Sequence, residues 1–186
     1  MTDRLKIYNS EIRGDAVAGD KTVYEAPLTT LEQVIEHITT NSNGAEEVLT
    51  DVIDELAGYL TDRPDREVIG LEEKLAQGGR NELAPNAKYL KNKFERKLAK
   101  QDLSRTTQNI YVQVLSSIIT AFEQEIRPLI FEERGKPEVD AAIHNEIILP
   151  VHKAVIRFDM LVTTEDVAGM LYFLTGKCHL VWSNQC

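Results

Sequence analysis

The sequence contains few cysteines and no long apolar segment. Only two of its 186 residues are cysteine, and Cys178 and Cys186 both lie close to the C-terminal end. This spacing excludes a disulfide framework and favours a reducing compartment such as the cytoplasm. No apolar run approaches the ~18 residues of a membrane-spanning helix, and the N-terminal stretch MTDRLKIYNSEIRGD holds no apolar signal core. We therefore expect a soluble cytoplasmic protein with no membrane partner.

Basic residues are outnumbered by acidic ones. Lys and Arg total 21 against 30 Asp and Glu, which gives a net charge of −9. The resulting field repels phosphate, so the composition argues against a dedicated nucleic-acid binder and against binding to anionic membranes. With 42% hydrophobic residues, a chain of this length suits one domain with a substantial core.

The first 27 residues differ in pattern from the rest of the chain. Apolar residues alternate in LKIYNSEI and again in KTVYEA, and two Gly-Asp pairs lie between the two stretches. This pattern predicts a β-hairpin-like arm over residues 1–27. An isolated hairpin is marginally stable in water, so the arm is expected either to be disordered or to pair with another strand. Its candidate partner-binding residues are Ile12, Gly14, Asp15, Val17, Gly19, Asp20, Lys21 and Val23.

Residues 28–186 are predicted to form one helical domain, because apolar residues recur there at helical spacing. The pattern indicates a mainly α fold, a bundle of about six helices. Pro128 and Pro150 fall inside helical patterns, so each is expected to kink or break its helix. The segment CHLVW at Cys178–Trp182 predicts a short C-terminal strand. Candidate helix N-caps are Thr29 or Thr30, Ser104 or Thr106, and Thr164.

Charge is distributed unevenly along this helical domain. Residues 28–87 hold 13 acidic and 4 basic side chains (4 − 13 = −9), whereas residues 88–105 hold 7 basic and 2 acidic ones (7 − 2 = +5). An acidic and a basic face on one small body suit charge-complementary docking, including self-association into a homo-oligomer. Two ordinary solvated faces would explain the same pattern.

The basic stretch also raises an alternative function, nucleic-acid sensing. Single strands bind where cations and aromatic side chains alternate, and Tyr89 and Phe94 interleave with the basic residues here. Phe94, however, lies on the apolar stripe and is expected in the core. The candidate nucleic-acid face consists of Lys91, Lys93, Arg96, Lys97 and Lys100.

No set of residues has the spacing of a catalytic or metal site. The stretch from Gly14 to Thr22 approaches a phosphate-binding loop, but Asp20 stands where the lysine should directly follow the second glycine. Histidines are not spaced as ligands: His144 and His152 have a proline between them, and adjacent Cys178 and His179 would point to opposite sides of a strand. Cys178 is expected to be structural. We predict no catalytic, cofactor-binding or metal-binding residues, with an unrecognised hydrolase or metalloprotein as the remaining alternative.

Several stretches together resemble a known family. They are GDAVAGDK at 14–21, GLEEKLAQGGRNEL at 70–83, AKYLKNKFERKL at 87–98, IRPLI at 126–130 and GMLYFLTGKCHLVW at 169–182. The chain thereby resembles the C-terminal domains of bacterial ABC-three-component systems, which are predicted anti-phage or anti-plasmid modules. The resemblance implies a non-catalytic, largely helical recognition module whose partners are an effector or an ABC-type ATPase component.

The residues and the resemblance together predict a non-enzymatic adaptor. The helical domain would dock a protein partner or a second copy of itself. The arm would add a strand to a partner, where main-chain hydrogen bonds supply affinity and Ile12, Val17 and Val23 supply specificity.

Overall fold

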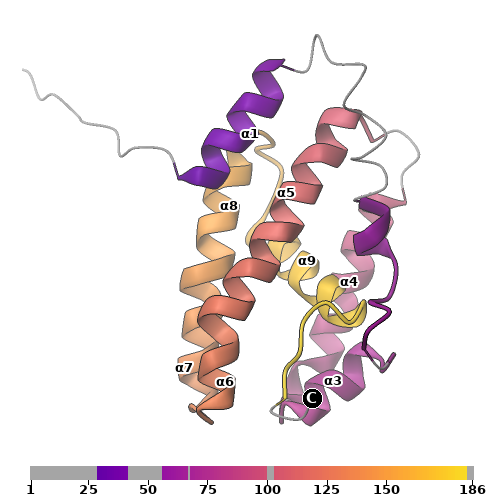
Figure 1. The fold of residues 1–186 in the computed structure, drawn as a ribbon, viewed down its shortest axis with the longest axis vertical. Coiled ribbons are helices and arrows are strands. Elements are labelled where there is room, and N and C mark those ends of the chain that lie inside the picture. Colours follow the sequence, from indigo (N-terminus) through magenta and orange to yellow (C-terminus); the bar gives the residue numbers. More distant parts are fainter. Residues whose placement is uncertain (1–28, 42–55, 67, 100–102, 184–186) are drawn as a thin grey trace, which may run out of the picture.

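The computed structural model describes residues 29–41, 56–66, 68–99 and 103–183. These residues are mainly helical and contain no strand, which confirms the predicted helical fold (Figure 1). The predicted arm over residues 1–27, with every partner-binding residue assigned to it, lies outside the described residues. The α-helices are α1 (Thr30–Asn41), α3 (Leu71–Gln77), α4 (Ala84–Leu98), α5 (Arg105–Ala121), α6 (Arg127–Phe131), α7 (Lys136–Ala142), α8 (Leu149–Ile156) and α9 (Thr164–Gly176).

Two long helical columns pass through the positions of Pro128 and Pro150 without ending there. The first joins α5 to α6 through a π-helical turn at Phe122–Ile126, and the second joins α7 to α8 through one at Ile143–Ile148. Proline has no N–H, and its ring clashes with the carbonyl one α-helical turn earlier. A π-helical turn that ends two residues before each proline shifts the hydrogen-bond register by one residue, so each column continues. Of the two predicted effects, a kink or a break, the break is therefore wrong, and the helical distortion is confined to the π-helical turns.

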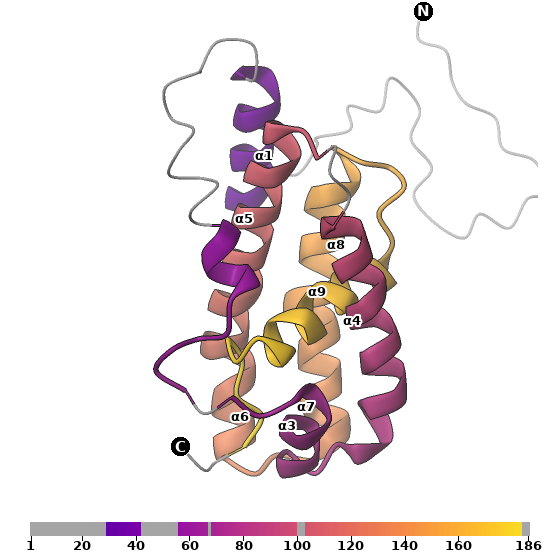
Figure 2. The ribbon, with the colours of Figure 1, turned by 90° about the vertical axis from the view of Figure 1, so that its right-hand side faces the viewer.

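The columns stand beside each other with α1 against them, and α4 lies on the opposite side of the body (Figures 1 and 2). Helix α9 runs obliquely through the middle of the body. It is buried on most of its faces, with Val167, Leu171 and Leu174 at most 1% exposed. A helix that is apolar on nearly every face is stable only in such a central position.

The closest helix packing joins α4 to α9. Gly169 of α9 faces the backbone of α4, where a methyl group on its Cα would come within 2.7 Å of the Leu90 carbonyl oxygen. The Phe94 ring packs edge-on against Phe173 of α9, at 5.3 Å between centroids, and against Tyr111 of α5, at 5.6 Å. Phe94 is thus a core residue, as its place on the apolar stripe predicts.

Helix α1 is fixed to the column formed by α7 and α8 through its first turn. Thr29 caps the helix by accepting a hydrogen bond from the Glu32 N–H at 3.3 Å, and the Glu32 carboxylate accepts one from the Thr29 N–H at 2.7 Å. Glu32 is buried and also pairs with the Arg157 guanidinium at 3.4 Å. The alternative of Thr29 or Thr30 is therefore resolved in favour of Thr29, and Ser104 is likewise the cap of α5.

The C-terminal segment is irregular, so the strand predicted for Cys178–Trp182 is wrong. Residues 177–183 form turns and bends, and Cys178 adopts a left-handed φ of 62°. Leu180 and Trp182 are nevertheless 0% and 3% exposed. The alternating apolar residues reflect packing of this segment into the core, since the described part of the chain offers no strand edge for it to join.

Candidate functional site

The loop from Arg157 to Thr163, between α8 and α9, carries the most exposed large apolar side chains among the described residues. Met160 is 83% exposed and Leu161 is 84% exposed. We call these two residues the apolar tip. Single exposed apolar residues are common on protein surfaces, but two adjacent ones on an ordered loop form a candidate contact for another protein.

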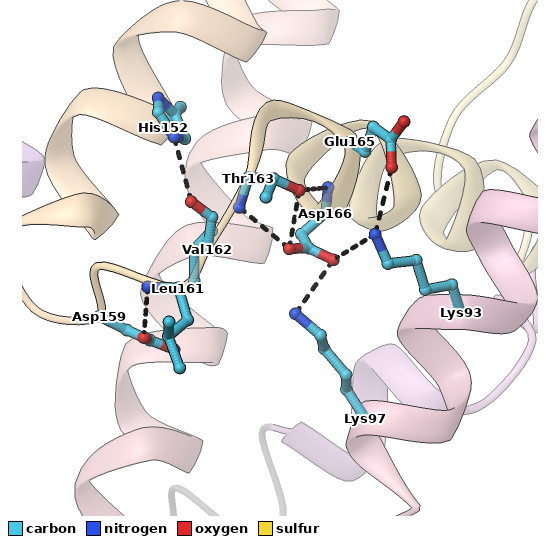
Figure 3. A network of polar contacts seen from close by, with 9 residues as sticks. All are labelled: Lys93, Lys97, His152, Asp159, Leu161, Val162, Thr163, Glu165 and Asp166. Carbon is cyan, nitrogen blue, oxygen red and sulfur yellow. Dashed lines mark hydrogen bonds and ion pairs between the residues drawn. The ribbon is translucent and has the colours of Figure 1, made fainter.

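Hydrogen bonds hold the backbone on both sides of the tip (Figure 3). The Asp159 carboxylate accepts a hydrogen bond from the Leu161 N–H at 2.9 Å, and Nε2 of His152 donates one to the Val162 carbonyl at 3.1 Å. The Val162 side chain is only 5% exposed. The loop is thus fixed before and after the tip, while the two tip side chains themselves contact mainly solvent.

The loop passes into α9 through a complete capping box, with Thr163 as N-cap and Asp166 at the third helical position. The Thr163 hydroxyl accepts from the Asp166 N–H at 3.2 Å, and the Asp166 carboxylate accepts from the Thr163 N–H at 3.0 Å. Val162 and Val167, both buried, occupy the two positions of a hydrophobic staple around this cap. The predicted cap, Thr164, is therefore wrong by one residue.

Asp166 also joins α9 to the basic side of α4 (Figure 3). Its second carboxylate oxygen lies 3.3 Å from the Lys93 ammonium and 3.0 Å from that of Lys97. Glu165 adds a contact of 3.2 Å to Lys93. Although Asp166 is buried, its negative charge is compensated by two cations and by the capping N–H and hydroxyl groups.

These contacts shift the acid–base equilibria of the site. Burial raises the pKa of Asp166, but hydrogen bonds from the Thr163 backbone and from Lys97 outweigh burial and lower that pKa to about 2. The hydrogen bond to Glu165 raises the pKa of Lys93. Both groups therefore stay charged at neutral pH.

Most of the basic stretch predicted as a nucleic-acid face is engaged within the protein. Lys91 pairs with Glu95 at 2.7 Å, and Lys93 and Lys97 pair with the acidic start of α9. Arg96 is exposed and forms no ion pair with a carboxylate of the described residues, and Lys100 lies outside them. The charge surplus counted in the sequence thus overstates the cationic character of this surface.

Sequence reasoning did not single out the apolar tip. Its residues belong to the run Met160–Leu161–Val162 directly before the N-cap Thr163. A hydrophobic staple requires an apolar residue only at the position directly before the N-cap, and Val162 fills that position. Local structure therefore does not require the two apolar residues before Val162. Their presence is the feature of the sequence that could have indicated the tip.

Of the residues considered for nucleophilic or metal chemistry, Cys178 and His179 follow the C-terminal end of α9 and lie apart from the tip, whereas His152 holds the loop through Val162. Cys178 is 1% exposed, and burial lowers the pKa of its neighbour His179. The His179 ring packs against Tyr59 at 5.6 Å between centroids. Within the described ranges, no group of three or more His, Cys, Asp or Glu side chains is placed to hold a metal ion.

The described residues define a helical domain, and none of their helices is long and apolar enough to cross a membrane. Residues 70–182 match the family model for C-terminal domain 9 of the ABC-three component (ABC-3C) systems. Since this match covers more than half of the sequence, the chain belongs to that family, as the resemblance predicts. The matched range contains α4, the apolar tip and α9, and it excludes α1 and the predicted arm. No curated protein and no solved structure matches the chain.

Proposed function

We propose that this chain is a non-enzymatic recognition module of a bacterial ABC-3C defence system and acts in the cytoplasm. It docks another protein component of that system, the ABC-type ATPase or the effector, through the apolar tip. Membership of a multi-component system supports the existence of protein partners. The observation that carries the proposal is the pair of side chains, Met160 and Leu161, more than four-fifths exposed on a loop whose backbone is fixed.

The energetics of the tip favour a protein partner. Covering a Met or Leu side chain contributes about 1.5–3 kcal/mol relative to leaving it in water. A preorganised loop loses little conformational freedom on binding, so more of that free energy remains as affinity. Methionine also adapts its shape to irregular surfaces. Two such residues on a rigid loop are therefore well suited to enter an apolar pocket of a partner.

The charges near the tip indicate the chemistry of the partner surface. Lys93 and Lys97, on the neighbouring helix, keep about a third of their side-chain surface exposed, and Arg96 adjoins them. A partner segment with an apolar pocket for the tip and acidic residues at its edge would complement this arrangement. Nucleic acid is a weaker candidate, because Glu165 and Asp166 together already compensate two of these cations.

The proposal predicts that the tip controls binding. Replacing Met160 and Leu161 together by serine should weaken binding to the purified ATPase or effector component by about 30-fold or more, equivalent to ~2 kcal/mol at a hot spot. The measurement is isothermal titration calorimetry with the full chain. Val68→Ser, which alters an apolar side chain 66% exposed outside the loop, is the matched control and should leave the affinity unchanged.

Other outcomes contradict the proposal in distinct ways. Equal affinity of the double variant and the control rejects the tip as the contact, and absence of binding to any component of the system rejects the docking function. If light scattering shows a homo-oligomer that the double variant dissociates, the occupant of the tip is a second copy of the chain instead. Steady turnover of a substrate by the purified chain would show that it is an enzyme.

The role predicted for the arm can be tested separately. Deletion of residues 1–25 should leave the helical domain folded and should alter assembly or partner capture, because strand addition would be lost. Circular dichroism reports the folding, and size-exclusion light scattering reports the assembly. Unchanged mass and unchanged partner capture would remove the arm from the model of binding.

A further inference from the structure

A cationic cavity lies at the end of α9 opposite to the apolar tip. Its volume is about 520 Å³, and it opens between α3, α6 and the segment that follows α9. The 13 residues of α9 separate it from the tip by about 20 Å, so the two features are independent. Three basic side chains, Arg66, Lys74 and Arg127, line the cavity together with a single carboxylate, Asp65.

Lys74 is the most buried of these cations. It is 7% exposed, and its ammonium donates a hydrogen bond of 2.6 Å to the carbonyl of Thr175 in the last turn of α9. It forms no ion pair with a carboxylate in the part of the chain that the structure describes. Burial lowers the pKa of Lys74, and the nearby Cys178 thiol opposes that shift. A buried ammonium compensated by a neutral carbonyl is costly, and a bound anion would offset part of that cost.

The two arginines share one carboxylate. Glu123 lies 2.5 Å from the Arg127 guanidinium and 3.8 Å from that of Arg66. Arg66 also donates hydrogen bonds to the carbonyls of Cys178 and His179, at 3.1 and 2.9 Å. These bonds fix the Arg66 guanidinium at the cavity wall. Their acceptors are neutral carbonyl groups, so they do not offset its positive charge.

The local charge is positive although the chain as a whole carries −9. Arg66, Lys74 and Arg127 give +3, Glu123 and Asp62, whose charge acts on Lys74, subtract 2, and Asp65 forms an ion pair with Arg63 that adds no net charge, so the cluster carries +1 (3 − 2 = 1). The amide of Gln77 and the hydroxyl of Ser183 supply further polar groups on the cavity wall. Apolar side chains of Ile69 and Leu180 cover the remaining side.

We propose that this cavity binds a phosphomonoester dianion. A phosphate monoester carries −1.5 to −2 charges near neutral pH, so the net positive cluster attracts it, and its oxygens accept hydrogen bonds from ammonium and guanidinium groups. A volume of about 520 Å³ lies in the range of small-molecule sites and exceeds what inorganic phosphate alone requires. The apolar wall accommodates the organic group that the phosphate carries.

The test uses the full chain at low ionic strength, with inorganic phosphate and adenosine monophosphate as probes for the two sources of the group. Calorimetry should detect saturable binding of adenosine monophosphate, and adenosine should not bind. Arg127→Gln should weaken that binding at least tenfold, the effect of losing one charged hydrogen bond. Arg134→Gln is the matched control, because it removes the same charge from an arginine that does not line this cavity, and it should bind normally.

A second measurement keeps the test decisive if a variant unfolds. Amide chemical shifts of the wild-type chain should change on titration around Gln77 and Ser183 and remain constant at the apolar tip. Tighter binding of the monophosphate than of inorganic phosphate supports an organic phosphate ligand, and equal binding supports phosphate itself. Three results would each overturn the proposal. They are tighter binding of succinate than of both probes, unchanged affinity in folded Arg127→Gln, and absence of saturation by about 10 mM ligand. A Kd of 10 mM corresponds to a binding free energy of about −2.7 kcal/mol.

Discussion

The two ends of α9 distribute charged and apolar side chains in opposite ways. At its N-terminal end, the carboxylates of Glu165 and Asp166 compensate the two ammonium groups of Lys93 and Lys97, and the neighbouring apolar side chains of the tip are left in solvent. At its C-terminal end the apolar residues are buried, and the cations beside them exceed the carboxylates. At the N-terminal end, polar groups fix the backbone of a loop whose exposed side chains are apolar. At the C-terminal end, buried apolar residues fix the wall of a cavity whose exposed side chains are charged.

The largest expected difference between the two ends concerns stability. Trp182 is 3% exposed, packs on Phe122 at 5.3 Å between centroids, and donates a hydrogen bond from Nε1 to the Thr175 hydroxyl at 3.0 Å. Trp182→Ala should lower the free energy of unfolding by about 3–5 kcal/mol, as for other large-to-small core changes. Met160→Ala at the tip should change it by no more than ~0.5 kcal/mol. Urea denaturation followed by circular dichroism measures the free energy of unfolding of both variants. Similar losses of stability in the two variants would contradict the proposed difference between the two ends.

The connection between the two ends depends on the tight contact of α9 with α4. Gly169→Ala would bring a methyl group within 2.7 Å of the rigid Leu90 carbonyl, so it should destabilise the fold by about 1–3 kcal/mol. Gly176→Ala is the matched control in the same helix, since its methyl group would crowd the flexible end of Lys91 and make an ordinary contact of 3.9 Å with Leu71. The control should change stability by less than ~1 kcal/mol. Equal effects of both substitutions in urea denaturation would show that α4 can move away from α9.

The smallest expected effect is the pH dependence of the N-terminal end. The pKa of Asp166 is lowered from 3.8 to about 2 in the folded protein, so its ionised form stabilises the fold. This stabilisation is fully present above pH 3.8 and is lost as the pH falls through about 2; it amounts to roughly 2 kcal/mol. Asp166→Asn should therefore flatten the stability profile between pH 4 and pH 2.

Comparison with the variant isolates this contribution. Other carboxylates with lowered pKa values, such as Glu32, titrate in both proteins and cancel in the difference. Parallel profiles of the wild type and Asp166→Asn over this range would mean that the hydrogen bonds from Thr163 and Lys97 do not stabilise the Asp166 carboxylate.

Local sequence patterns predicted most of the helices and some of the residues at which they begin or end. The apolar stripe containing Leu90 and Phe94 predicted α4, and Ser104 marked the start of α5, because spacing and caps act within a few residues. Local patterns gave wrong predictions where tertiary packing determines the backbone conformation. The apolar residues at Cys178–Trp182 are buried in the core and are not paired in a sheet. The π-helical turns allow both helical columns to continue past their prolines.

The candidate sites were less predictable than the fold. The basic residues of α4 could be counted in the sequence, but their ion pairs with the start of α9 join residues more than 60 positions apart. Lys74 and Thr175 are separated by 101 positions, so no local pattern indicates that this lysine is buried. The predictions for the arm remain predictions, because its residues lie outside those that the structure describes.

Helical character and the candidate caps of α1 and α5 follow from residues close together in the sequence, because amphipathic spacing and capping are short-range effects, and the family follows from stretches spread along the sequence. Which charges are compensated, which apolar side chains stay in solvent and where cations gather depend on segments brought together by folding. The burial of a side chain and the identity of its charged neighbours are properties of that assembled surface, so only the packed helices determine the tip at one end of α9 and the cationic cavity at the other.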